Sequence, residues 1–220
     1  MADQKKENPI HVMPEARVTN NSLFEKDIYE DERGNQGTPS YKIELAFDPA
    51  SVQGEGLFDE ILAQHAVDTW GEPAWNDFFD GRIRSPFIDG DFIASKRAEK
   101  GKAGDAYKGK LVLRTHTLFN KDGVNGPGGI QVYDPDCKLV TVQNQGVVYN
   151  GCFGQVAVTI DSYTDSRTGQ KCLMTYLAGF QKTRDGDRLA TARDLSQLFK
   201  PVGRPAAADG AAPARARRRG

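Results

Sequence analysis

The chain has 220 residues, the length of one ordinary domain or of one domain with appendages. A hydrophobic content of 38%, with 11 Phe, 7 Tyr and 2 Trp, is sufficient for a packed core, and no apolar run approaches the roughly 18 residues that span a bilayer. The net charge of −1 argues against a protein held on nucleic acid by bulk charge alone.

The near-neutral total hides three strongly charged segments. Residues 55–91 carry nine acidic residues and two arginines, a net charge of −7. Residues 96–114 carry seven basic and two acidic residues, a net charge of +5, and residues 200–220 also sum to +5. A polyanion would be attracted to the second and third segments and repelled by the first.

Cysteine and histidine usage indicates neither a disulfide framework nor a metal site. The cysteines are odd in number and form no CxxC pair, which favours a reducing cytoplasm. The histidines lack metal-ligand spacing, so no metal or other cofactor is predicted. Residues 1–9 are polar and lack the apolar stretch of a secretory signal. The three cysteines are Cys137, Cys152 and Cys172, and the three histidines are His11, His65 and His116.

The first half of the chain contains one clear strand and one clear helix. Residues 1–15 are expected to form a flexible lead. Residues 41–47 alternate between apolar and polar side chains, which predicts a half-buried strand. Residues 57–70 place apolar side chains at helical spacing and are followed by Gly71, which predicts a helix that ends there. Residues 81–107 are expected to form a loop.

The second half is richer in strands. The patterns predict a long strand at 108–119, a short one at 129–133 after a glycine-rich connection, and two more at 153–163 and 172–183. The even-numbered residues Tyr176, Phe180 and Lys182 are expected to share one face of the last strand.

The C-terminal residues are expected to differ from the rest. Residues 194–199 are predicted to form a last helical turn. Residues 200–220 consist largely of Ala, Pro, Gly and Arg and are expected to be disordered. The prediction is therefore a lead at 1–15, a domain at 16–199 with a helix and loop insertion at 48–106, and a tail at 200–220.

These elements predict a mainly β fold. Five to six long strands with glycine-bearing connections, and one helix inserted after the first strand, favour a small closed or partly closed barrel. A sandwich would have more and shorter strands, and an α/β fold would alternate strands with helices.

Two sequence patterns raise catalytic alternatives. Residues 104–111 differ from a phosphate-binding P-loop because Leu111 stands where Ser or Thr would bind magnesium, and because a strand follows them. The acids at Asp89–Asp91 and Asp185–Asp187 lie in Asp-Gly-Asp sequences that are typical of turns. A two-metal nuclease would also gather acids, so that alternative stays open.

Aromatic and basic residues interleave along the predicted strands. Single-stranded nucleic acid is bound by flat rings that stack on unpaired bases and by cations that follow the phosphates. About half of the ring candidates are expected to be core residues. The candidate phosphate contacts are Lys96, Arg97, Lys100, Lys102, Lys108, Lys110, Arg114, Lys182 and Arg184. The candidate stacking residues are Tyr107, Tyr133, Tyr149, Phe153, Tyr176 and Phe180.

Four patches in order make the chain recognisable: PFIDGD at 86–91, AYKGK at 106–110, VYNGCFG at 148–154 and LAGFQKTRDGDRL at 177–189. On these patches, residues 86–199 resemble a family of tailed-phage single-stranded-DNA-binding proteins with an OB fold. The resemblance implies a five-stranded OB-fold barrel without catalysis or cofactor. It also implies sequence-nonspecific coating and protection of single-stranded DNA (ssDNA) during phage replication, recombination or repair.

The resemblance further implies a place and partners. The place is the cytoplasm of the infected bacterium, with no membrane contact, and the partners are ssDNA, phage replication or recombination proteins, and further copies of the chain. Replicative proteins of this kind often end in an acidic tail, whereas this chain ends in ARARRRG. The tail is therefore expected to attract DNA phosphates, and the acidic segment 55–91 is expected to face away from DNA. The alternatives are an RNA-binding OB-fold protein, a metal-dependent nuclease and a phage assembly protein.

Overall fold

The computed structural model describes residues 8–28, 34–117 and 129–189, which belong to a unit that ends at Leu189. The predicted helical turn at 194–199 and the basic tail at 200–220 lie outside the described residues. No helix in the described ranges is long and apolar enough to cross a membrane.

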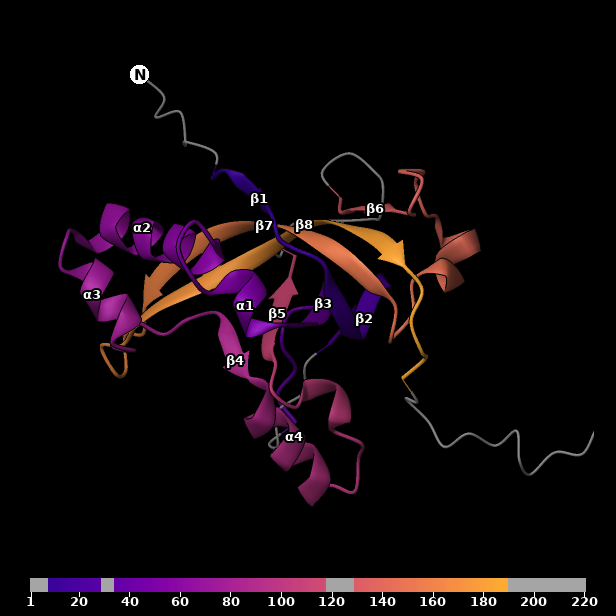
Figure 1. Cartoon of the computed structure of the whole chain (residues 1–220), viewed down its shortest axis with the longest axis horizontal. Coiled ribbons are helices and arrows are strands. Elements are labelled where there is room, and N and C mark those ends of the chain that lie inside the picture. The colour runs from indigo at the N-terminus through magenta and orange to yellow at the C-terminus, as the bar shows by residue number, and fades with distance from the viewer. Residues whose placement is uncertain (1–7, 29–33, 118–128, 190–220) are drawn as a thin grey trace, which may run out of the picture. The chain divides into compact units, whose positions relative to one another are not determined.

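Strands dominate the described chain, so the predicted mainly β class is confirmed, although several helices accompany them (Figure 1). The strands are β1 (Ile10–Val12), β2 (Ala16–Asp27), β3 (Ser40–Phe47), β4 (Phe87–Asp89), β5 (Leu111–His116), β6 (Gln131–Tyr133), β7 (Phe153–Thr164) and β8 (Lys171–Arg184). The helices are α1 (Pro49–Val52), α2 (Phe58–Trp70), α3 (Ala74–Phe79) and α4 (Gly90–Glu99), with 3-10 turns η1 (Asp105–Tyr107) and η2 (Val142–Val147).

Five strand pairings form a closed cycle. β2 pairs with β3, β3 with β5, β7 with β8 and β7 with β2, all antiparallel, while β5 and β8 pair in parallel. The β5–β8 pairing consists of His116 opposite Tyr176, which makes it the shortest pairing in the cycle. β1, β4 and β6 attach outside the cycle, to β7, β5 and β8 respectively.

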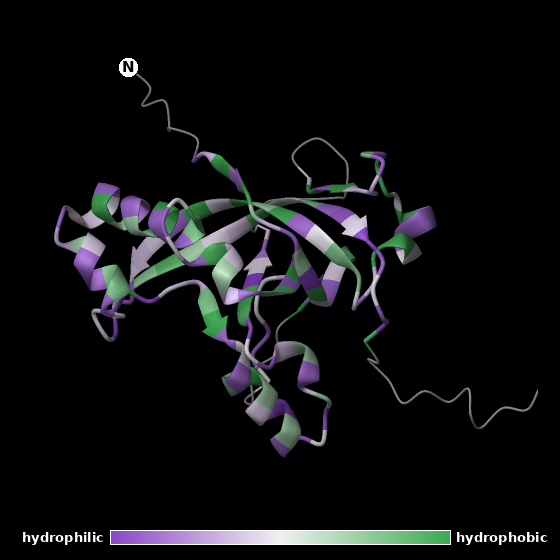
Figure 2. Ribbon diagram, in the orientation of Figure 1, coloured by the Kyte–Doolittle hydropathy of each residue, from purple (hydrophilic) through white to green (hydrophobic). Residues whose placement is uncertain are grey.

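The main core lies between the inner faces of these strands. Val156, Val158 and Ile160 alternate along β7 and are buried, and Phe47 on β3 and Leu62 on α2 join them. Figure 2 shows the corresponding interleaving of apolar and polar residues along the strands. Burial of this apolar surface is the dominant stabilising term for such a fold.

A smaller core lies on the opposite, outer side of β3 and β5. There Ala46 and Val112 pack against Ile93 and Ala94 of α4 and against Tyr107 of η1. The predicted loop at 81–107 was therefore wrong for this part, because it contains β4 and α4. A helix that buries so few apolar side chains lacks the periodic stripe by which a helix is recognised.

The N-terminal residues also differ from prediction. Ile10–Val12 form β1 against β7, and Met13 is buried in the main core, so these residues are not a flexible lead. β2 was not predicted at all, because polar residues such as Asn20 and Asn21 break its alternation near a register shift.

The α4 docking site gives a test of this packing. A Cβ on Gly90 would lie 2.0 Å from the Tyr107 carbonyl oxygen and 2.5 Å from that of Lys110. Gly90→Ala should therefore lower the free energy of unfolding by about 1–3 kcal/mol in urea titrations. Gly146→Ala is the control, since a Cβ added there would meet nothing within 4 Å. Equal stability of the two variants would contradict the described packing of α4.

Candidate nucleic-acid interface

A row of directly opposed residues crosses the outer face of the sheet from β8 to β4. Directly opposed residues on paired strands project from the same face. α4 covers Ala46 and Val112 in the middle of the row, and Ile88 at one end packs against the same small core. The row consists of Arg184, Phe153, Arg17, Ala46, Val112 and Ile88.

The β8 end of the row carries stacked cations and rings. The guanidinium carbon of Arg184 lies 3.5 Å from the Phe153 ring centroid, and that of Arg17 lies 5.9 Å from it. Arg188 lies 4.1 Å from the centroid of Tyr149. We call these five residues the guanidinium–ring cluster. Stacking leaves the edges of a guanidinium for hydrogen bonds, and here Arg17 donates to the Asp187 carbonyl at 3.0 Å and Arg184 to Glu15 at 2.9 Å.

Carboxylates balance the cations of this end. Arg184 is paired with Glu15 at 2.9 Å, and the Thr183 hydroxyl, by its hydrogen bond, holds the pKa of Glu15 below its usual value. Lys182 donates to Asp185 at 2.7 Å, which likewise lowers the pKa of that carboxyl. Both carboxylates are ionised at neutral pH. A phosphate must therefore displace Glu15 from Arg184 and Asp185 from Lys182, or share these cations with them.

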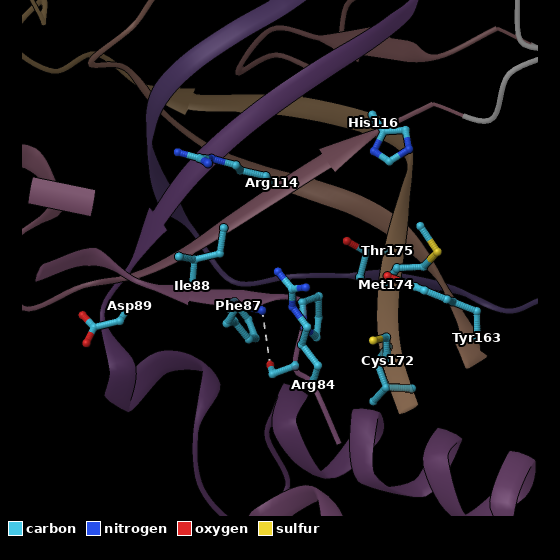
Figure 3. Close-up of a pocket in the computed structure, with 13 residues that line it drawn as sticks. Arg84, Phe87, Ile88, Asp89, Arg114, His116, Tyr163, Cys172, Met174 and Thr175 are labelled. Carbon is cyan, nitrogen blue, oxygen red and sulfur yellow. Dashed lines mark hydrogen bonds between the residues drawn. The ribbon is translucent and has the colours of Figure 1, made fainter. Parts of the chain in front are cut away.

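The β4 end of the row opens into a cavity of about 470 Å³, which we call the β4–β8 cleft. Figure 3 shows Arg84 between Phe87 and Thr175, with Arg114 and His116 projecting from β5. The lining residues are Arg84–Asp89, Arg114, His116, Tyr163 and Cys172–Thr175. A concave site of this size with a few polar groups is typical of ligand sites.

One cation of the cleft is open to a ligand. Arg84 takes no part in the ion pairs found in the described chain, while its main chain is fixed to β8 by bonds to Lys171 and Leu173 of 2.9 Å each. Arg84 therefore offers its guanidinium to an anionic ligand, while Thr175 lies on the buried face of β8.

Two further side chains shape the cleft. Burial, with a contribution from the charge of Lys42, lowers the pKa of His116, which is therefore neutral near pH 7. Arg114 pairs with Glu44, whose other oxygen accepts from Tyr107 at 2.7 Å and from Thr19 at 2.8 Å. This network fixes the guanidinium of Arg114 at the rim.

The basic segment Lys96–Lys110 adjoins α4. Lys96 pairs with Glu99 at 3.0 Å, Lys108 with Asp105 at 2.7 Å, and Lys110 with Asp48. Exposed pairs of this kind contribute about 0–1 kcal/mol, so the lysines can exchange partners. Arg97 instead has a structural role, because it donates to the Ala103 carbonyl at 2.7 Å and stacks over Tyr107. Lys100 and Lys102 are exposed.

Three predicted contacts lie inside the fold, and for these the prediction is corrected. Tyr107 is only 4% exposed because its hydroxyl serves Glu44, and Phe180 is 2% exposed because it packs over Gly154. Lys182 is 6% exposed and directed to Asp185 and the Tyr149 ring. Neither ring can stack on a base in this arrangement, and the Lys182 amine is not presented to solvent.

The other candidates fall into separate groups. Tyr149, Phe153 and Arg184 meet in the guanidinium–ring cluster. Arg114 lines the cleft, and Tyr176 lies beside it, with its ring centroid 5.5 Å from that of His116. Tyr133 lies on β6 opposite Gln181 and does not line the cleft. Sequence reasoning missed Arg17, Arg84, His116, Tyr163 and Arg188; of these, Arg17 was detectable as a polar residue between the apolar Ala16 and Val18.

Comparison with known proteins now adds to this geometry. Residues 16–209 match the family described as "Enterobacter phage Enc34, ssDNA-binding protein". The chain belongs to the Enc34 ssDNA-binding protein family. No curated protein sequence gives a significant match.

Solved structures of phage single-stranded DNA-binding proteins have a similar fold. The Enc34 protein in complex with ssDNA has a TM-score of 0.57 at 15% identity, covering 82% of this chain and 89% of that one. The Enc34 protein alone has a TM-score of 0.55 at 14% identity, covering 87% and 90%. Gp2.5, a single-stranded DNA-binding protein encoded by bacteriophage T7, has a TM-score of 0.53 at 12% identity, covering 91% and 100%.

The corrected role of Tyr107 gives a second test. Tyr107→Phe removes a hydrogen bond to a buried carboxylate and should lower the free energy of unfolding by about 1.5–3 kcal/mol. Tyr133→Phe is the matched control, since its hydroxyl bonds to Gln131 at the surface, and it should change stability by less than about 0.5 kcal/mol. Urea unfolding measures both. Loss of DNA affinity at unchanged stability would instead place Tyr107 in contact with DNA.

Proposed function

We propose that the chain coats and protects single-stranded DNA during phage DNA replication or recombination. The observation that carries the proposal is the outer-face row, which has stacked arginines at one end and, at the other, a cleft lined by Arg84, Arg114 and His116. Membership of a family described by ssDNA binding supports the same ligand. Rings and cations on one face are what unpaired bases and phosphates require.

We further propose that the cycle of five strands is an OB-fold barrel. In chain order, its strands are β2, β3, β5, β7 and β8, and β5 closes in parallel on β8. OB folds bind oligonucleotides on the face of their second and third strands and with the loops beside it. Here that face carries Lys42, Arg114 and His116, which supports a binding path that includes the cleft.

The chemistry of the side chains separates the residues that would contact phosphates from those that would contact bases. Arg17, Arg84, Arg114 and Arg184 would contact phosphates, with the exposed lysines of the basic segment between the two ends of the row. At one end bases would stack on the guanidinium planes of Arg184 and Arg188, which lie over Phe153 and Tyr149. At the other end they would stack on the 44%-exposed Tyr163. Each stacked base contributes about 1–3 kcal/mol, and every base has a flat face, so such binding tolerates any sequence.

We propose that most of the acidic segment lies apart from this path, although the ring of Phe58 on α2 is 6.2 Å from that of Phe87 in the cleft. α2 and α3 pack on one another, and α2 also packs on β7, with Phe58 and Leu62 of α2 in the main core. Asp89 is the exception because it lines the cleft, although its carboxylate accepts the Asp91 amide at 2.8 Å. We propose that α2 and α3 face away from bound DNA.

A direct test compares ligands. An oligo(dT) strand should bind tightly in a gel shift, and a blunt duplex of equal length should bind much more weakly. A matched RNA strand competes with the DNA strand to separate the RNA-binding alternative, since contacts to the 2′-hydroxyl decide that preference. Labelled DNA should stay intact in the presence of magnesium. Equal affinity for strand and duplex would refute single-strand selectivity.

The cleft can be tested through Arg84. Arg84→Ala removes a cation that lacks an ion-pair partner in the described chain, so it should lower oligo(dT) affinity roughly tenfold. The slope of log K against log[salt] should become shallower by about 0.7, the value for one phosphate contact on a single strand. Lys138→Ala, an equal charge change at an exposed lysine paired with Asp136, should leave both unchanged. An unaffected slope in Arg84→Ala would remove Arg84 from the DNA path.

The neutral His116 predicts a pH effect. A folded-state pKa below the ordinary 6.5 means that the free fold loses stability as the pH falls through 6.5, because the unfolded chain binds this proton more readily. A phosphate beside the ring favours protonation, so oligo(dT) affinity should rise as the pH falls from about 7.5 to about 5.8. His116→Gln should reduce this gain. His65→Gln, on α2, should retain it, and a full gain in His116→Gln would contradict the assignment.

A further inference from the structure

β1 is an end strand of the described sheet, and one of its edges is open. Its ladder runs against β7, with Met13 N–H donating to Val156 O at 2.9 Å. Along an antiparallel strand, alternate residues bond to the neighbour, so His11 and Met13 face β7. The N–H and C=O groups of Ile10 and Val12 consequently point to the other edge, away from β7.

The ladder stops abruptly at the N-terminal side of β1. Pro9 has no N–H, and the side-chain amide of Asn8 donates instead to Ile160 O at 2.9 Å. On the open edge, Pro14 is the next outward position after Val12 and also lacks an N–H, so pairing there is limited to a short stretch centred on His11.

The side chains beside this edge are apolar and exposed. Ile10 is 63% and Val12 is 68% exposed, and both project on the same face. That face borders a trough of about 270 Å³ whose floor includes Ala157, Ala178 and Gly179. No residue that lines the trough is charged. Proteins usually protect an edge strand with a charged side chain, which β1 lacks.

We propose that β1 is a self-association surface, on which the β1 strands of two copies pair antiparallel about a two-fold axis at His11. In this register Ile10 lies opposite the partner's Val12, and Val12 lies opposite the partner's Ile10. Both residues of each pair carry outward N–H and C=O groups, so each pair exchanges both hydrogen bonds, and the aliphatic side chains pack together.

The strand is self-complementary, which favours a second copy over an unrelated segment. A two-fold interface uses the same patch twice, so three residues supply every contact on both sides. Two copies also meet here without like charges, since neither β1 nor the trough is charged. The short ladder predicts weak, concentration-dependent dimers.

The pairing would also join the outer faces of two copies. Ile10 lies opposite Thr159, Thr159 opposite Tyr176, and Tyr176 opposite His116, so a continuous row connects β1 to the cleft. Copies bound next to one another on a strand would have a raised effective concentration for this contact. Only this consequence rests on the proposed function.

The test is sedimentation velocity of the full chain without DNA over a concentration series. The wild type should show a dimer that grows with concentration. Val12→Pro should remain monomeric, because proline removes an outward N–H while leaving the His11 and Met13 bonds to β7 in place. Val12→Thr, which retains the N–H and a branched Cβ, should still dimerise. Ile10→Lys keeps every N–H and adds like charges near the two-fold axis, so it should be monomeric. If Val12→Pro unfolds, Ile10→Lys alone tests whether β1 forms the dimer contact.

A wild type that stays monomeric at every concentration would overturn the proposal, as would Ile10→Lys dimers of unchanged strength. The assay contains no DNA, so its outcome is separate from that of the proposed function. Binding of a short oligo(dT) strand that holds one protein should be unchanged in Ile10→Lys.

Discussion

The buried carboxylate of Glu44 holds the outer face of this protein together. Glu44 is 7% exposed, and its partners come from three elements: Thr19 on β2, Tyr107 on η1 and Arg114 on β5. A buried charge is tolerated only when it is paired and hydrogen-bonded. The docking of η1 beside α4 and the position of Arg114 at the cleft therefore depend on one another.

The same logic of paired charges explains how a chain with a net charge of −1 can present a binding surface for a polyanion. Carboxylates neutralise most of the relevant cations in the free protein, as Glu15 does for Arg184 and Asp48 does for Lys110. A phosphate offers these cations the same kind of hydrogen bond. Binding then exchanges one anionic partner for another, and the total charge of the chain is a poor guide to its ligand.

Sequence patterns found the elements whose alternation is regular and missed those whose contacts are few. β3, α2, β7 and β8 were predicted because each is long and rich in apolar residues, although β3 is buried on both faces where a half-buried strand was expected. α4 was not, because its burial rests mainly on Ile93 and Ala94. The expectation that Tyr176, Phe180 and Lys182 share a face was wrong. A register shift in the β7–β8 pairing, between Val158 opposite Leu177 and Ala157 opposite Gly179, turns Tyr176 outward and Phe180 inward. A pattern of period two cannot reveal such a shift.

The closed cycle of strands also sets the order in which the protein can fold. β2 pairs with β7 through Ala16 opposite Gly154 and Arg17 opposite Phe153, and β5 pairs with β8 through His116 opposite Tyr176. Contacts between residues so distant in the chain make folding slow, since a large loop must close before they form. A growing chain can pair β2 with β3 early, but it cannot place Arg17 and Arg184 around Phe153 until β8 has been synthesised.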